Sequence, residues 1–174
     1  AILVTLVVPC AQGTATGASA DAPAAQQTLL AKGSQPEAAI VVGQDSGPFY
    51  RWVAGELQRY VRELSGAELP IVTADAPPTE KTLIVLGGPA VNPLCGAAQE
   101  KGLVRFEGLK PDGLIVRTID LEGRAAVVVG GNDEPGTMYA AYEFLEQLGI
   151  VFQLTNDIIP EKKTDLLLPA LDVR

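Results

Sequence analysis

The side chains of this 174-residue chain that could do chemistry are acidic. Paired carboxylates can cleave glycosidic bonds, one as general acid and the other as nucleophile or base. Two pairs stand out, Asp133-Glu134 and Glu143 with Glu146. Three-residue spacing places Glu143 and Glu146 on one helix face, which is typical of solvated surface charge. Asp133-Glu134 precedes an amphipathic segment, where acid caps a helix and complements its dipole. The sequence therefore predicts no catalytic residue.

The loop at residues 130–136 is bounded by glycines and follows an apolar run. Its polar residues Asn132 and Asp133 could reach a ligand, although backbone geometry alone also explains such a loop. Both remain candidate ligand-binding residues. Gly87-Gly88 also follows an apolar run, but the phosphate-binding spacings GxGxxG and GxxxxGK[ST] are absent.

Two aromatic residues near the start of a predicted helix, Tyr50 and Trp52, could form a platform on which a sugar stacks. Packing against neighbouring loops is the alternative. We keep Trp52 as a candidate carbohydrate-binding residue.

The chain contains no histidine, so a Ser–His–Asp or Cys–His arrangement is excluded. Its cysteines, Cys10 and Cys95, are far apart and form no CxxC pair. We interpret Cys95 as a small buried residue. No metal-ligand spacing is present, and we expect neither a metal nor a cofactor. A formal net charge of −8 also argues against a nucleic-acid partner, which requires a basic face.

The N-terminal residues resemble what remains of an export signal. Residues 1–8 are uncharged and mostly apolar, too short to span a bilayer, and a low-complexity stretch follows. We interpret residues 1–20 as a signal-peptide remnant that ends at Ala18-Ser19-Ala20, and residues 21–36 as a flexible lead-in. A lipobox-like alternative, Val7-Val8-Pro9-Cys10, would place lipid on Cys10, and membrane association is expected only in that case. A core strand over residues 1–8 is a third interpretation. The expected location is secreted or periplasmic.

Periodicity predicts two main helices in residues 37–174. Apolar steps of three and four indicate a helix over 49–64, with Pro48 in its first turn and Gly66 as a left-handed cap. A second helix begins at Asp133-Glu134 and ends at Gly149. Strands are predicted at 38–42, 69–73, 82–86, 104–107, 113–118, 125–129, 150–154 and 166–168, with a weak helix over 92–101. The segments 113–118 and 125–129 should form a hairpin. The fold class is therefore α+β, an α/β sandwich in which two main helices pack on a mixed sheet.

Several segments in order resemble one family. GGNDEPGTMYAAYEFLEQLGIVF (130–152) looks like the end of the N-terminal domain of alpha-glucuronidases and related large glycoside hydrolases. AGELQRYVRELSGAELPIV (54–72) is similar to the first helix of that domain. KTLIVLGG, and PDGLIVRT followed by AAVVVGGND, resemble its next strand and its hairpin. The same domain type precedes the barrel of beta-N-acetylhexosaminidases, so the resemblance implies a hexosaminidase domain-2-like fold.

The resemblance also implies a division of labour. The catalytic acids of these enzymes lie on a (β/α)8 barrel, and LLLPALDVR (166–174) resembles the segment that leads into it. The expected function is a non-catalytic N-terminal accessory domain of a secreted hydrolase that acts on polysaccharide such as xylan. Its expected partners are that barrel and carbohydrate. A stand-alone carbohydrate-binding module and a structural domain of an exported lipoprotein are the alternatives.

Overall fold

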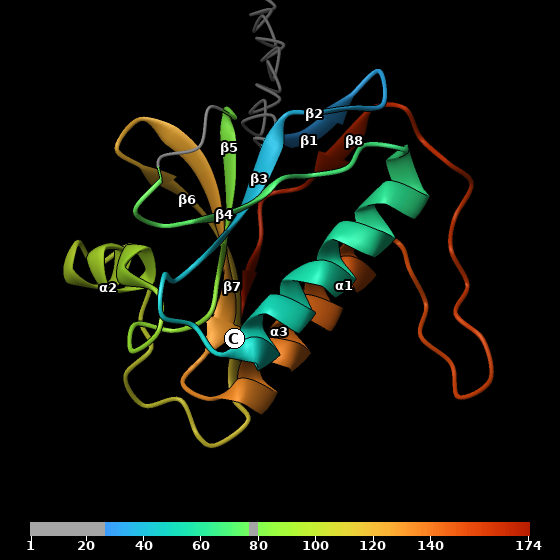
Figure 1. Ribbon diagram of the computed structural model, residues 1–174. Helices are drawn as coiled ribbons and strands as arrows, with labels where there is room; N and C mark the ends of the chain where they lie inside the picture. The colour runs from blue at the N-terminus through green and yellow to red at the C-terminus, as the bar shows by residue number, and fades with distance from the viewer. Residues whose placement is uncertain (1–26, 77–79) are drawn as a thin grey trace, which may run out of the picture.

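The structure is a computed structural model that describes residues 27–76 and 80–174. In these residues, three helices and nine strands form an α+β fold (Figure 1). The predicted signal remnant, its cleavage site and Cys10 lie outside the described residues. A six-stranded mixed sheet is the centre of the molecule, in the order β4-β3-β5-β7-β6-β9. Its strands are β3 (Ala38–Val42), β4 (Ile71–Thr73), β5 (Thr82–Leu86), β6 (Leu114–Leu121), β7 (Arg124–Gly131) and β9 (Asp172–Val173).

Strands β4, β3, β5 and β7 run parallel, whereas β6 is antiparallel to β7 and to β9. The β6–β7 pair confirms the predicted hairpin, with Leu121 opposite Arg124 at its turn. Strands β3 and β5 are buried at every position. Such uninterrupted apolar runs are typical of parallel strands covered on both faces.

Helices cover both faces of this sheet. Figure 1 shows α1 (Pro48–Ser65) and α3 (Glu134–Gln147) side by side on one face and the short α2 (Pro93–Glu100) on the other. The two main predicted helices are thus confirmed as neighbours. Helix α1 ends where Gly66 adopts a φ of 80°, the left-handed cap expected from the sequence.

Alternate residues of the central strands feed two separate cores. In β5, Ile84 and Leu86 pack with α1 and α3, while Leu83 and Val85 pack with α2 and the segment that follows it. Phe144 of α3 is fully buried in the larger core, and Phe106 lies in the smaller one. The sheet is therefore held between two apolar layers of unequal size.

A small second sheet corrects the expectation of a flexible lead-in up to residue 36. Strands β1 (Thr28–Lys32) and β2 (Gln35–Pro36) form a hairpin, and β1 pairs with β8 (Leu166–Leu168). Leu30 and Ala31 have no exposed surface. Strand β1 is ordered because β8, more than 130 positions later in the chain, pairs with it and packs apolar side chains against it.

Two predicted strands are wrong. Residues 104–107 alternate apolar and polar, but they form no ladder, and the Phe106 amide donates to the side chain of Gln99. Residues 150–154 make only one isolated bridge, between Val151 and Ile158. This segment packs on helices instead: Phe152 stacks edge-on against Tyr60 of α1 and Tyr142 of α3.

Candidate functional site

The parallel strands β3, β5 and β7 end at one edge of the sheet, and a helix begins shortly after each of them. This carboxyl edge is where open α/β sheets bind ligands. Its connecting loops are residues 43–47, 87–92 and 132–133. The predicted ligand-binding residues Asn132 and Asp133 lie here, and Trp52 lies in the second turn of α1.

Backbone contacts close much of this edge. A Cβ on Gly43 would lie 1.6 Å from the carbonyl oxygen of Val91, and a Cβ on Gly130 would lie 1.8 Å from that of Gly87. Only a glycine hydrogen fits at such distances. The loops after β3 and β5, and the ends of β5 and β7, therefore pack backbone against backbone at these two points.

Asn92 seals the gap between β3 and β5. Its side-chain amide donates to the carbonyl oxygens of Val41 and Leu86, at 3.0 and 2.9 Å. Its oxygen accepts from the amide of Leu94 and caps α2. The residue has no exposed surface. Sequence reasoning missed this role, although an Asn directly before Pro93 is a recognisable helix start.

Asp133 is the N-cap of α3. One carboxylate oxygen accepts from the amide of Gly136 at 2.8 Å, and the other accepts from the amide of Asp112 at 3.1 Å. The capping interpretation of this acid is thus supported by geometry, and the carboxylate also holds the loop before β6. Both oxygens of Asp133 therefore accept hydrogen bonds from backbone amides of the protein itself.

Asn132 is likewise committed to the protein. Its amide nitrogen donates to the carbonyl oxygen of Phe106 at 3.1 Å, which ties the loop after β7 to the segment after α2. Asn132 and Asp133 therefore fix the edge of the sheet. Contact with a ligand there remains a prediction.

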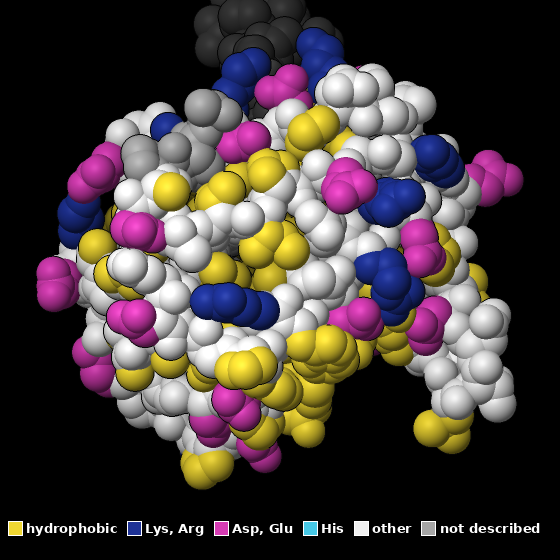
Figure 2. Space-filling model, viewed as in Figure 1, with side chains coloured by type: hydrophobic (Ala, Val, Ile, Leu, Met, Phe, Trp, Pro, Cys, Tyr) yellow, Lys and Arg dark blue, Asp and Glu magenta, His cyan; other side chains and the backbone are white. Residues whose placement is uncertain are grey.

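Tyr50 and Trp52 do not form a joint platform. Tyr50 is buried, and burial together with the charges of Glu134 and Asp133 raises its pKa, so the phenol stays protonated. Trp52 is 49% exposed and leans on Phe49, with ring centroids 5.7 Å apart. Figure 2 shows apolar side chains gathered over the N-terminal ends of α1 and α3, at the lower centre of the view. Trp52 is thus the one member of the pair that a sugar could reach.

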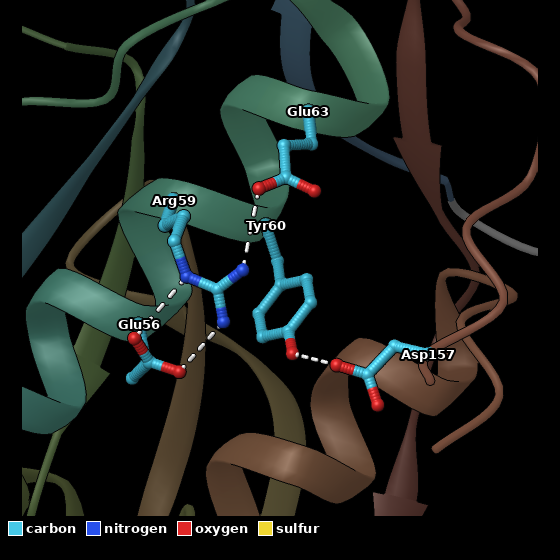
Figure 3. Close-up of polar contacts among 5 residues, drawn as sticks. All are labelled: Glu56, Arg59, Tyr60, Glu63 and Asp157. Atoms are coloured by element: carbon cyan, nitrogen blue, oxygen red, sulfur yellow. Dashed lines mark hydrogen bonds and ion pairs between the residues drawn. The ribbon is translucent and has the colours of Figure 1, made fainter. Parts of the chain in front are cut away.

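Charged side chains on α1 are paired with one another (Figure 3). Arg59 bonds Glu56 at 2.8 Å and Glu63 at 3.2 Å, and its guanidinium lies 3.8 Å from the centre of the Tyr60 ring. The hydrogen bonds that Arg59 donates to Glu56 raise the pKa of Arg59, against an opposing effect of burial. The Tyr60 hydroxyl donates to Asp157. This cluster joins α1 to the segment after α3, and Arg59 is paired with two carboxylates of its own helix.

Cys95 is also structural. Cys95 is buried, burial raises its pKa, and its thiol donates to the carbonyl oxygen of Gly87 at 3.2 Å. This placement agrees with the small buried residue that we expected. Within the described residues, no group of three or more acidic, Cys or His side chains could hold a metal ion. No helix in that part of the chain has the length and apolar character to cross a membrane.

Comparison with known families finds a match to the model described as "Glycosyl hydrolase family 67 N-terminus" over residues 22–144. No curated protein matches the chain. Among solved structures, "Structure of CpGH84D" aligns with 82% of this chain at 14% identity and a TM-score of 0.45. The chain covers 21% of that structure's own chain.

Proposed function

We propose that this protein is the non-catalytic accessory domain of an enzyme that degrades polysaccharide. The family match spans more than half of the chain, so the chain belongs to the family of N-terminal domains of glycosyl hydrolase family 67. The observation that carries this proposal is the match itself. The hydrogen bonds of Asp133 support it, because one carboxylate oxygen caps α3 and the other accepts from the amide of Asp112 in the loop before β6. The finer assignment, to alpha-glucuronidase or a related xylan-degrading enzyme, belongs to the same proposal.

The carboxyl edge is the surface that we propose faces the catalytic barrel. Arg174 lies there, because β9 runs alongside the start of β6, with Val173 opposite Val116. Its guanidinium donates to the carbonyl oxygen of Glu107 at 2.8 Å. A polypeptide that continued past Arg174 would therefore leave the domain beside the loops that hold Asn132 and Asp133. Those loops would brace the barrel and border its substrate cleft.

Hydrolysis by the chain alone tests the non-catalytic assignment. The purified chain is incubated with aryl glucuronides, aryl xylosides and aryl N-acetylglucosaminides, and released phenol is measured. We expect no turnover above buffer. Turnover that disappears in Asp133→Asn or in Glu143→Gln would overturn the proposal.

A carbohydrate-binding module is the second candidate, favoured by the half-exposed ring of Trp52. Affinity electrophoresis in xylan and in chitin-like polymers tests it, with Trp52→Ala compared with Tyr139→Ala. Tyr139 is a matched control because it is 46% exposed on the other helix. Retardation lost only in Trp52→Ala would support this candidate, and equal migration with and without polymer would count against it.

We also propose that the protein is exported. The composition of residues 1–20 supports a secreted or periplasmic protein, and Cys10 supports a lipid anchor as the alternative route. The mass of the mature N-terminus separates the two. Cleavage after Ala20 would indicate simple export, a lipid-modified Cys10 would indicate the lipoprotein, and an unprocessed N-terminus would contradict both.

A further inference from the structure

The connections after β3 and β5 leave the sheet on opposite faces. Helix α1 follows β3 on one face and α2 follows β5 on the other (Figure 1). Such a change of side creates a crevice outside the carboxyl ends of the two strands. Asn92 fills the base of that crevice. Beside it, a cavity of about 430 Å³ opens, lined by Gln44 and Asp45, by Ala74 and Asp75, and by residues 89–93.

The cavity has rigid, partly apolar walls. Pro89, Val91 and Pro93 supply C–H surfaces, and the proline rings fix the local backbone. Asn92 forms part of the lining, but its amide is fully bonded to Val41, Leu86 and Leu94. The cavity is thus preformed rather than closed by a mobile side chain. Its volume lies within the usual range of small-molecule sites.

Three exposed polar side chains, Gln44, Asp45 and Asp75, stand around this cavity. In the described part of the chain, neither carboxylate makes an ion pair or a hydrogen bond with the protein. This differs from Asp133, Glu56 and Asp157, which are all engaged. Asp45 and Asp75 therefore keep their acceptor capacity for a ligand.

The chemistry of the lining selects the class of ligand. Two carboxylates accept hydrogen bonds from hydroxyl groups, an amide both donates and accepts, and proline C–H surfaces pack against a sugar ring. Among the described residues that line the cavity there is neither Lys nor Arg, so the two carboxylates would repel an anionic ligand. We propose that this cavity binds a neutral sugar unit of a polysaccharide and rejects uronic acids. Polysaccharide as the source of the sugar rests on the proposed function.

Amide chemical shifts of the ¹⁵N-labelled chain test this proposal, with xylotriose and glucuronic acid as probes. Xylotriose should shift the amides of residues 43–47, 74–75 and 90–92, and glucuronic acid should leave them unchanged. Asp45→Asn and Asp75→Asn should each weaken xylotriose binding about tenfold, because a charge-assisted hydrogen bond becomes a neutral one. Ala90→Trp, which fills the cavity and keeps both carboxylates, should abolish binding. Glu161→Gln, a distant exposed acid, is the matched control.

Four results would overturn the proposal: no shifts with xylotriose, equal or tighter binding of glucuronic acid, shifts centred on Trp52, or binding lost on addition of a chelator, which would indicate a metal ion between the carboxylates. Failure here is distinguishable from failure of the accessory role. If the chain binds no sugar and hydrolyses nothing, the accessory role still stands and only the cavity proposal fails. If the chain alone hydrolyses a substrate, the accessory role fails whatever the cavity binds.

Discussion

At the scale of single residues, small and amide side chains determine how the carboxyl edge closes. Asn92 satisfies two strand-end carbonyls and caps a helix with one side chain, while Gly43 and Gly130 let neighbouring loops meet backbone to backbone. Residues in such positions have few substitutes. Their replacement should affect folding far more than replacement of exposed acids.

Replacement of Asn92 by Ala should lower the free energy of unfolding by about 3 kcal/mol, because two buried carbonyls lose their donor and α2 loses its cap. Urea unfolding measures the change. Asn92→Asp separates the two roles, since it keeps the capping oxygen but cannot donate. A nearly wild-type Asn92→Asp would contradict this account of the donor role.

Two glycine substitutions should act in opposite directions. Gly130→Ala should destabilise the protein by at least about 2 kcal/mol, because its Cβ would meet the carbonyl of Gly87. Gly55→Ala is the matched control within α1, where a Cβ meets nothing within 4 Å. It should stabilise the protein by about 0.5–1 kcal/mol through helix propensity. The thermal midpoints of both variants, measured at one pH, test these two expectations. A Gly130→Ala variant with the wild-type midpoint would contradict the close packing of Gly130 against Gly87.

At the scale of elements, local signals identified most of the main sheet and both main helices. The buried runs of β3 and β5, the Pro48 and Gly66 boundaries of α1 and the β6–β7 turn are all features of neighbouring residues. What could not be predicted depends on distant partners. Strand β1 needs β8, and the segment after α3 is apolar because it packs on helices rather than because it joins a sheet.

The candidate site divides in the same way. The capping role of Asp133 follows from its position before Pro135, but its bond to the amide of Asp112 does not. Exposure of Trp52 and burial of Tyr50 depend on how α1 sits against α3, which periodicity alone does not fix. The cavity at Asp45 and Asp75 joins loops more than 25 residues apart, so no local pattern indicates it.

The α3 cap carries a prediction of its own. Asp133→Ala should cost about 1–2 kcal/mol of unfolding free energy, and Glu134→Ala much less, because only Asp133 accepts hydrogen bonds at the helix start. Urea unfolding of both variants measures the difference. Equal losses would mean that a general charge effect at the helix start explains the stability.

The segment at residues 150–165, here called the arm, makes few polar contacts in its middle. Tyr60 donates to Asp157, Val151 bridges Ile158, and the amide of Lys163 donates to Leu64. Tyr60→Phe should therefore release the middle of the arm. Hydrogen exchange at Ile158 should accelerate, while the amide of Lys163 stays protected. Tyr139→Phe, on an exposed ring, should change neither, and an unchanged Ile158 in Tyr60→Phe would contradict the role of this bond.

At the scale of the whole molecule, the chain is a sheet covered by helices, and the candidate residues Asn132, Asp133, Asp45 and Asp75 lie at one edge of it. Apolar side chains fill both cores, Asp133 at that edge caps α3, and the described lining of the open cavity carries two carboxylates but neither Lys nor Arg. The arm projects from the body at the lower right of Figure 2, with Leu154 fully exposed. These features are consistent with the accessory role that we propose.

The central claim, an accessory domain joined to a catalytic one, is tested most directly by reconstitution. The polypeptide encoded after Arg174 is produced separately, and its thermal midpoint and hydrolysis of glucuronoxylan are measured with and without this chain. The account predicts that the chain alone hydrolyses nothing and that its addition raises the thermal midpoint of the catalytic part. Hydrolysis by the chain alone, or a catalytic part whose midpoint does not respond to the chain, would contradict it.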